Sequence, residues 1–194
     1  MGVVRLRWML FIKTADLMDC AKFKRVTRPV VAMNRARDFN EILIIDLKKW
    51  CNCWILHMID MYSRYTVSVY ISRKRPSDVV HAIINDWISI YGVMGKINYE
   101  NGGEFANEEL LQVQSMLNIE PSPTRSESAY QNDICERNHE VVDLVLTKVV
   151  KEYPQTSKKV LLKWSSTSKN SLQMVEGFSL HQLDFGRNPH LPNS

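Results

Sequence analysis

The sequence contains few cysteines, and their positions argue against two kinds of protein. There are four in 194 residues, Cys20, Cys51, Cys53 and Cys135, and their spacing matches neither a disulfide framework nor a paired zinc-ligand motif. A secreted protein held together by disulfides is therefore disfavoured. We expect an intracellular protein with reduced thiols, located in the nucleus or the cytoplasm and not secreted.

The sequence also lacks a long hydrophobic run. The apolar stretch from Trp8 to Ile12 is flanked closely by Arg7 and Lys13, and it is shorter than the ~7–15 residues of a signal-peptide core. No stretch has the ~20 apolar residues that a membrane-spanning helix needs. We therefore expect neither a signal peptide nor a membrane partner.

The charge balance is only weakly basic, but the basic residues are clustered. Lys and Arg total 25 against 21 Asp and Glu, which gives a formal net charge of +4. One segment has no acidic residue and six basic ones: Lys22, Lys24, Arg25, Arg28, Arg35 and Arg37. Such a run is either a solvated linker or a segment that contacts a polyanion, and both alternatives stay open.

Hydrophobic periodicity predicts an α/β chain. Three short β-rich runs, "EILIID", "WILHMID" and "YTVSVYI", follow one another from Glu41 and indicate an antiparallel meander. The segments predicted after them are a helix over 76–92, a strand over 96–99, a helix with Asn107 as N-cap, a short strand over 118–123, a helix from Asp133 to about Val150 and a helical segment over 157–175. This order predicts a mixed five-stranded sheet flanked by helices, followed by a tail that ends in turn residues.

Three acidic residues from distant parts of the sequence are candidates for one site. Asp46 is expected to close the first strand, Glu100 to close the fourth, and Glu136 to open the long helix. Clustered carboxylates are tolerated mainly around a hard divalent cation such as Mg²⁺, and two such ions about 3.5–4 Å apart would support an in-line displacement at a phosphodiester. Each acid also has a structural interpretation. Asp46 would be a polar strand end, and Glu136 would form a capping box with Asp133.

The segment between the fourth strand and the next helix has further polar residues. Glu104 is interpreted as a solvated turn residue. Gly102 and Gly103 allow a sharp turn or a close approach of a phosphate backbone.

The spacing of the three acids and several short motifs carry a family resemblance. Between Asp46 and Glu100 lie 53 residues, and between Glu100 and Glu136 lie 35. With these intervals the sequence resembles the catalytic core of retroviral and retrotransposon integrases, whose D,D-35-E triad sits on a ribonuclease-H-like fold. The resemblance is closest to integrases of Ty3/gypsy-like elements, and it is carried by "RPVV", "FNEILIIDLK", "ILHMIDMYSRY", "NGGEF", "CERNH", "SKNSLQ" and "GFSLHQLDFGRNPHLP".

The resemblance implies roles for individual residues. Asp46, Glu100 and Glu136 would be the catalytic residues and would bind two Mg²⁺ or Mn²⁺ ions for 3′-end processing and strand transfer in DNA integration. The partner would be DNA, with a homo-oligomer expected. The DNA-binding residues would be Lys22, Lys24, Arg25, Arg28, Asn101 and Asn132. Asp60 would be a motif residue of the second strand and not a metal ligand.

The sequence departs from the family pattern at the site itself. Glu100 stands where the family has Asp, so the carboxylate lies one methylene farther from the backbone and catalysis is expected to be impaired. Asp133 adds a negative charge near the expected site, and Asp184 occupies a usually apolar position where burial without a partner would cost stability. A non-catalytic DNA-binding or assembly protein that kept the integrase fold is the alternative function, and a degenerate copy without a role is a third.

The amino-terminal zinc-binding module of the family is incomplete in this chain. No His precedes Cys20, and Leu17 stands where the first Cys of a C-x-x-C would fall, so no structural zinc is expected. We expect three regions: a truncated remnant of that module with a basic linker over 1–37, the catalytic core over 38–153, and a helical extension of the core over 154–194.

Overall fold

The computed structural model describes residues 35–100, 102–124, 129–187 and 189, without the side chains of Glu100, Thr124 and residues 129–132. The residues from Arg35 to Arg187 form one compact unit. Several predictions fall outside the described residues. These are the zinc-module remnant, the linker residues Lys22, Lys24, Arg25 and Arg28, the residue Asn101 and the side chain of Asn132.

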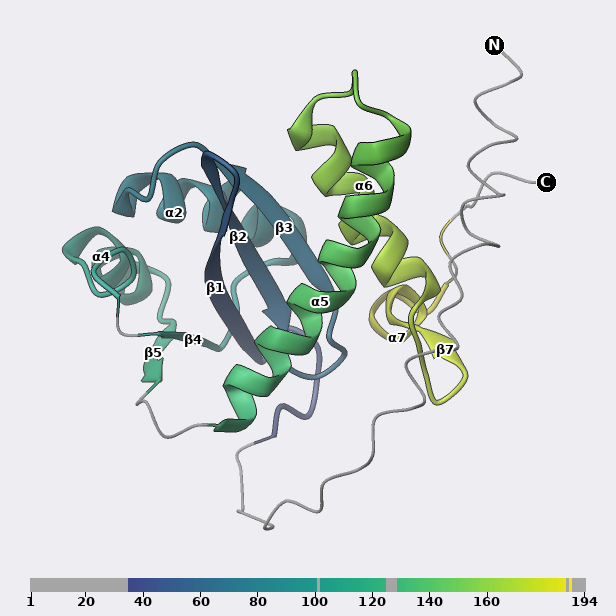
Figure 1. Ribbon diagram of the computed structural model, residues 1–194. Helices are drawn as coiled ribbons and strands as arrows, with labels where there is room; N and C mark the ends of the chain where they lie inside the picture. Colours follow the sequence, from purple (N-terminus) through teal and green to yellow (C-terminus); the bar gives the residue numbers. More distant parts are fainter. Residues whose placement is uncertain (1–34, 101, 125–128, 188, 190–194) are drawn as a thin grey trace. The chain divides into compact units, whose positions relative to one another are not determined.

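The centre of this unit is a mixed five-stranded sheet, as predicted (Figure 1). Its strands are β1 (Ile42–Trp50), β2 (Cys53–Asp60), β3 (Thr66–Ile71), β4 (Lys96–Glu100) and β5 (Glu120–Thr124). Their spatial order is β3-β2-β1-β4-β5. The first three strands form an antiparallel meander, and β1, β4 and β5 are parallel. The α/β class and the mixed sheet flanked by helices are thereby confirmed.

Helices follow the strands in the predicted order. They are α2 (Pro76–Ile83), the π-helical segment η2 (Ile84–Ile88), α3 (Ser89–Tyr91), α4 (Glu108–Met116), α5 (Ala129–Glu152), α6 (Lys158–Leu172) and α7 (Leu180–Phe185). The predicted helix over 76–92 is thus three consecutive segments, which end at Gly92 with a positive φ of 85°. The Asn107 side chain caps α4 by accepting the Leu110 N–H, as predicted. None of the helices in the described part of the chain is both long and apolar enough to span a bilayer.

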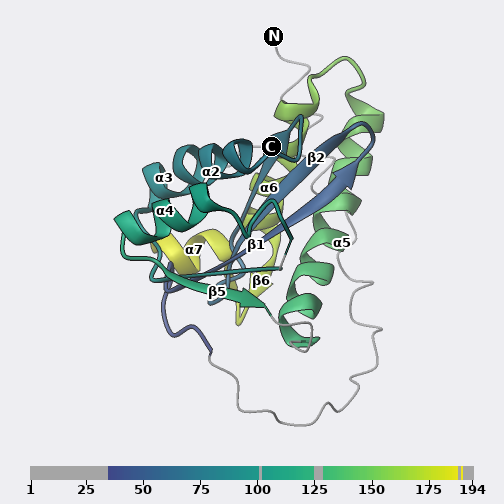
Figure 2. The ribbon, with the colours of Figure 1, turned by 90° about the vertical axis from the view of Figure 1, so that its left-hand side faces the viewer.

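The helices cover the two faces of the sheet unequally. Alternation along β1 sends Leu43 and Ile45 into a large apolar cluster with α2, η2 and α4. Ile42 and Ile44 point the other way, into a small cluster with Ile134 of α5. Figure 2 shows α2 and α4 on one side of the sheet and α5 on the other. By the same alternation, Asp46 follows Ile42 and Ile44 on the α5 side.

Two boundary predictions around the candidate site are wrong. Asp46 does not close its strand, because β1 stays paired with β2 up to Trp50 and Cys53. Glu136 does not open its helix, because α5 begins at Ala129. Asp133 therefore lies inside the helix, where it pairs with Arg137 at 2.6 Å, and the capping box is wrong as well.

The segment after α6 is more structured than predicted. Two short strands, β6 (Met174–Val175) and β7 (Phe178–Ser179), form a hairpin that leads into α7. Ser179 and Gln182 make a capping box at the start of α7, and Phe185 packs against Phe39 and Tyr91. The hairpin and α7 were not predicted, and the turn residues expected at the end of the chain lie largely outside the described residues.

Polar contacts join the C-terminal helices to the sheet. Asn170 of α6 accepts the Thr66 N–H and donates to the Thr66 carbonyl. Asp184 of α7 accepts a hydrogen bond from Ser63 at 2.9 Å, so it has a partner. Burial nevertheless raises the pKa of Asp184 to about 7.

Candidate active site

Asp46 lies in the middle of β1 with a half-buried carboxylate. It is paired across the ladder with His57 of β2, and its side chain is 21% exposed. Burial raises the pKa of Asp46, and the negative charge of Glu104 adds to this effect. A hydrogen bond from the Leu47 backbone and the charges of Lys48 and Lys74 oppose it. Asp46 is thus a carboxylate whose charged form lacks full compensation from the protein.

Glu100 reaches the same place from a neighbouring strand. Tyr99 of β4 pairs in parallel register with Ile45 of β1, so the next residues along the two strands, Glu100 and Asp46, have adjacent backbones. Glu100 is also the last residue of β4, as predicted.

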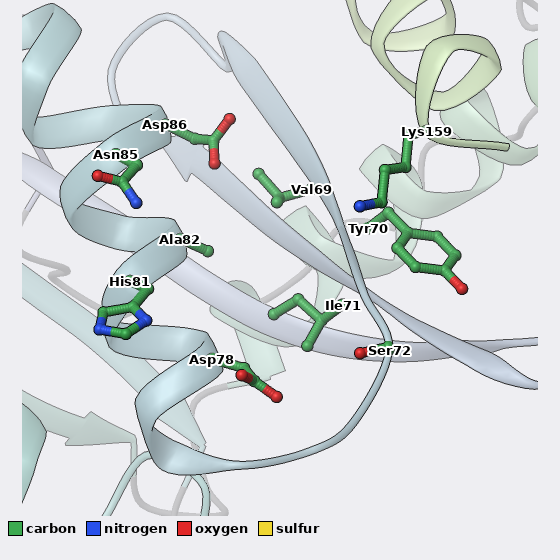
Figure 3. Close-up of a pocket in the computed structure, with 10 residues that line it drawn as sticks. All are labelled: Val69, Tyr70, Ile71, Ser72, Asp78, His81, Ala82, Asn85, Asp86 and Lys159. Atoms are coloured by element: carbon green, nitrogen blue, oxygen red, sulfur yellow. The ribbon is translucent and has the colours of Figure 1, made fainter. Parts of the chain in front are cut away.

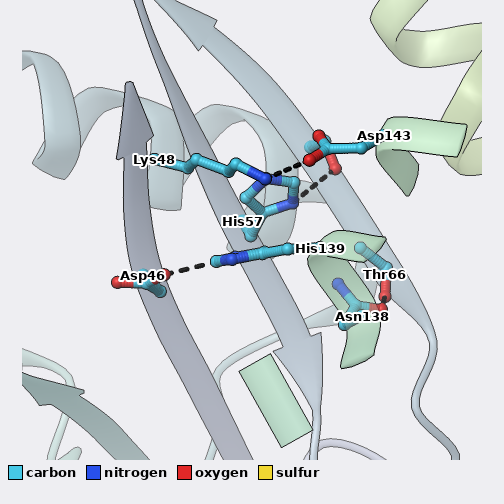
Figure 4. A network of polar contacts seen from close by, with 8 residues as sticks. Asp46, Lys48, His57, Thr66, Asn138, His139 and Asp143 are labelled. Atoms are coloured by element: carbon cyan, nitrogen blue, oxygen red, sulfur yellow. Dashed lines mark hydrogen bonds and ion pairs between the residues drawn. The ribbon is translucent and has the colours of Figure 1, made fainter. Parts of the chain in front are cut away.

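Glu136 is carried past Asp46 by α5. His139 lies one helical turn beyond Glu136, and its Nε2 is 3.2 Å from Oδ2 of Asp46 (Figure 4). The helix therefore crosses β1 at the level of Asp46. The Glu136 side chain is exposed to solvent.

Two contacts fix α5 at this crossing. Lys48 of β1 forms an ion pair with Asp143, one turn beyond His139. The Thr66 hydroxyl of β3 donates to Oδ1 of the buried Asn138 at 2.7 Å. Figure 4 shows these contacts on either side of the His139 ring.

Two histidines, one from β2 and one from α5, form a layer beside Asp46 between the sheet and α5. The ring of the fully buried His57 lies 4.2 Å from that of His139, and its Nδ1 is 3.0 Å from the Ser68 hydroxyl. Burial lowers the pKa of His139 to about 4 and that of His57 well below its usual value. Both rings are therefore neutral at pH 7, and the His139 contact with Asp46 is neither a charged pair nor a hydrogen bond by its geometry.

Sequence reasoning missed this histidine layer. A usable signal existed, because pairing the predicted first and second strands as a hairpin places His57 opposite Asp46. The role of His139 depends on where α5 crosses the sheet, and no local pattern determines that crossing.

Glu104 is the second residue that sequence reasoning misjudged. Its side chain is only 12% exposed and pairs with Lys74 at 2.5 Å, so the solvated-turn interpretation is wrong. The carboxylate folds back over Gly102, where an added Cβ would lie 2.7 Å from its oxygens. A side chain at position 102 would therefore displace the Glu104 carboxylate from this position. The charge of Glu104 also acts on Asp46, which places it beside the candidate site.

The donor chemistry around Asp46 fits a hard divalent cation. Carboxylate oxygens are the ligands that Mg²⁺ and Mn²⁺ prefer, and a cation would compensate the charges of Asp46 and Glu104. Among the side chains that the structure describes, no three or more His, Cys, Asp or Glu are grouped so as to hold a metal ion. The Glu100 side chain is not among those described. The roles of Asp46, Glu100 and Glu136 as metal ligands therefore stay a prediction.

The fold is that of known integrase catalytic cores. The catalytic core of HTLV-2 integrase, solved in complex with magnesium, matches with a TM-score of 0.68 and 18% identity over 77% of this chain and 99% of the other. The core of BIV integrase matches with a TM-score of 0.67 and 16% identity over 76% and 95% of the two chains. A chain of the simian T-cell lymphotropic virus intasome matches with a TM-score of 0.74 and 19% identity over 89% and 64%. At these identities the likeness establishes the ribonuclease-H-like fold.

The sequence itself matches one family model. Residues 38–129, slightly less than half of the chain, match the integrase core domain. The resemblance to integrase catalytic cores is thereby confirmed. The Ty3/gypsy-like branch stays a prediction. No curated protein matches the chain.

Proposed function

We propose that the protein is a retrotransposon-derived integrase-like polynucleotidyl transferase whose Asp46, Glu100 and Glu136 form the reacting centre. The observation that carries this proposal is the convergence of three elements at Asp46. Glu100 is adjacent in parallel register on β4, and α5, which carries Glu136, touches Asp46 through His139. The reaction class is phosphoryl transfer on DNA, in 3′-end processing and strand transfer.

The chain's carboxylates would hold Mg²⁺ or Mn²⁺. When bound, two such ions polarise the phosphodiester and stabilise the entering and leaving oxygens. Asp46 offers a half-buried carboxylate whose pKa is raised mainly by burial and further by the charge of Glu104. Lys74 pairs with Glu104 and so limits the repulsion within the site.

We propose that Glu100 impairs this activity. Its extra methylene displaces the carboxylate from the position that an Asp would give it, and a shift of about 1 Å at a reacting centre can cost on the order of 10²-fold in rate. Magnesium tolerates such a shift poorly because it demands near-ideal octahedral geometry.

The partners follow from the same proposal. DNA would be contacted by Lys22, Lys24, Arg25 and Arg28 and by Asn101 and Asn132. A homo-oligomer is proposed because the HTLV-2 core is described in dimeric and trimeric forms. The working compartment would be the nucleus or the cytoplasm.

The test is divalent-ion-dependent joining on a branched DNA substrate, because this assay depends least on the incomplete amino-terminal module. Glu136→Gln should abolish the activity that is seen with Mn²⁺. Glu140→Gln is the matched control, because Glu140 is also exposed on α5, one turn farther along. Equal activity of the two variants would contradict the proposed role of Glu136.

The alternative function is a non-catalytic DNA-binding or assembly protein. The substitution of Glu100 for the family Asp favours it, because the charge is kept while the geometry is altered. This alternative predicts DNA binding without metal-dependent joining under any of these conditions, and identical behaviour of Glu136→Gln and the unmodified chain.

A further inference from the structure

Three lysines lie over three aromatic rings at one end of the sheet. Lys74 Nζ is 5.1 Å from the Trp54 ring centroid, Lys158 is 5.3 Å from that of Trp50, and Lys159 is 5.5 Å from that of Tyr70. All three rings are half-exposed, and all three lysines are exposed. We call these six residues the basic–aromatic edge.

The edge is built from four segments of the chain and from both faces of the sheet: Trp54 packs against the apolar cluster under α2, whereas Trp50 and Tyr70 alternate to the face of α5 and α6. Trp50 faces Cys53 across the β1–β2 turn, Trp54 pairs with Ile71, and Ile55 pairs with Tyr70. Lys74 follows β3, and Lys158 and Lys159 open α6. Figure 1 shows the β1–β2 turn and the start of α6 at the same end of the sheet, and Figure 3 shows Lys159 beside Tyr70.

The charge at this end is mostly free for a partner. Lys158 and Lys159 have no ion-pair partner among the residues that the structure describes, whereas Lys74 pairs with Glu104. Three exposed cations lie nearby in the chain, Lys49 near the end of β1 and Arg73 and Arg75 between β3 and α2. Two further acids, Asp78 and Asp86, line the pocket between α2 and β3 together with Tyr70 and Lys159 (Figure 3), and Asp86 is paired with Lys163.

Trp50 of the edge lies on the same strand as Asp46, and α5 covers the stretch between them, where its Asp143 pairs with Lys48. Asp46, Lys48 and Trp50 alternate along β1 and therefore share the face covered by α5 and α6. At about 3.3 Å per residue, Trp50 lies roughly 13 Å from Asp46 along the strand. At about 3.4 Å per nucleotide, that is roughly four nucleotides of a stacked DNA strand.

We propose that the basic–aromatic edge binds unpaired DNA next to the reacting phosphodiester, an inference that rests on the proposed function. Half-exposed aromatic rings offer stacking surfaces to bases that are not already stacked in a duplex, and lysines beside them match the phosphates of the same strand. A base that stacks on one of these rings takes the place of the ammonium group, which moves to the phosphate.

The test measures binding of the full chain to a fluorescent oligothymidylate and to a duplex of equal length, without metal ions. Trp50→Leu should weaken single-strand binding about 10-fold, the scale expected for one stacked base, and should leave duplex binding nearly unchanged. Trp50→Phe keeps a ring and should restore binding. This rescue separates stacking from misfolding.

The lysines are tested through the salt dependence of the same binding. Neutralising both Lys158 and Lys159 to Gln should flatten the slope of log affinity against log salt by about 1.4, since each phosphate contact on a single strand contributes about 0.7. Arg187→Gln is the control, because Arg187 is exposed on the segment after α7. Unchanged single-strand binding in the Trp50→Leu and double-lysine variants would overturn the inference. So would an equal loss of duplex binding, or tighter binding of the edge to anionic vesicles than to DNA.

The outcome is separable from that of the proposed function. Loss of single-strand binding in the edge variants, together with an inactive chain, would uphold the edge and contradict the catalytic proposal. Metal-dependent joining with normal binding by the edge variants would do the reverse.

Discussion

The two faces of the central sheet differ in the polarity of the side chains that they bury. The face under α2, η2 and α4 is an apolar core that contains the fully buried Trp87 and Phe105. The face under α5 and α6 has a small apolar cluster and a band of buried polar side chains: His57, Thr66, Ser68, Asn138, Lys169 and Asn170. Several of its polar atoms, including Nε2 of His57, make no hydrogen bond.

This difference assigns separate tasks to the two faces. Apolar burial stabilises the fold, whereas buried polar groups cost free energy wherever a hydrogen bond is missing. The apolar face therefore supplies stability. The polar face is less stabilising because some of its buried polar atoms lack hydrogen bonds, but its polar contacts position α5 next to Asp46.

The largest expected effect is on the apolar face. Trp87→Ala should lower the free energy of unfolding by about 3–5 kcal/mol, because Trp87 is fully buried and its indole N–H donates to Asn40. Urea denaturation measures the change. Ile90→Ala is the control, since Ile90 is 62% exposed, and a loss of similar size there would contradict the assignment of the core.

The second effect concerns catalysis on the polar face. Glu100→Asp should raise Mg²⁺-dependent joining on the order of 10²-fold, because it restores the shorter side chain. Mn²⁺ should partly rescue the unmodified chain, and DNA affinity should hardly change. No gain in a well-folded variant would favour the non-catalytic alternative. A further Asp133→Gly change on that background then shows whether Asp133 has disabled the site.

The third effect is a pH dependence of stability. Between pH 6.5 and about 4 the unfolded chain protonates His139 while the folded protein keeps it neutral, so stability falls as pH falls. His139→Gln should flatten this fall by up to about 1.4 kcal/mol per pH unit. Denaturation at a series of pH values measures it. His81→Gln, at an exposed position of α2, should leave the profile unchanged.

The smallest effect tests the layer beneath His139. Ser68→Ala removes the hydrogen bond between the Ser68 hydroxyl and Nδ1 of His57 and should cost about 1–3 kcal/mol, at the lower end if the ring re-orients. Ser171→Ala is the control, because Ser171 is exposed to solvent at its hydroxyl and bonds only within α6. Equal stability of the two variants would show that the buried polar band carries no energetic cost.

The fold was largely predictable because its signals are local. A few neighbouring residues are enough to predict several elements. Examples are the apolar run before Asp46, the helical stripe after Pro76 and the N-cap at Asn107. The end of β1 was not predictable in this way. Two consecutive lysines, Lys48 and Lys49, are typical of a solvent-exposed turn, and only the backbone pairing with β2 extends the strand through them. The start of α5 was missed because Asp133, three residues before Glu136, has the spacing of a capping box. In the structure Asp133 lies inside the helix and forms an ion pair with Arg137.

The sequence selects the three acids of the candidate site, whose role stays a prediction, but it does not indicate what surrounds them. Asp46, Glu100 and Glu136 stand out through their spacing. Glu104 is largely buried and forms an ion pair with Lys74, which lies 30 positions earlier in the chain, so no local pattern indicates the contact. His139 meets Asp46 only through the packing of α5 on the sheet, which no sequence pattern encodes.

The most direct test of the central claim is Mn²⁺ binding by the full chain, followed by electron paramagnetic resonance in a titration. If Asp46, Glu100 and Glu136 share one divalent-ion site, then Asp46→Asn, Glu100→Gln and Glu136→Gln should each weaken binding by at least about 10-fold, and Glu140→Gln should bind like the unmodified chain. Unchanged Mn²⁺ affinity in the three site variants would contradict the claim that these carboxylates form the reacting centre.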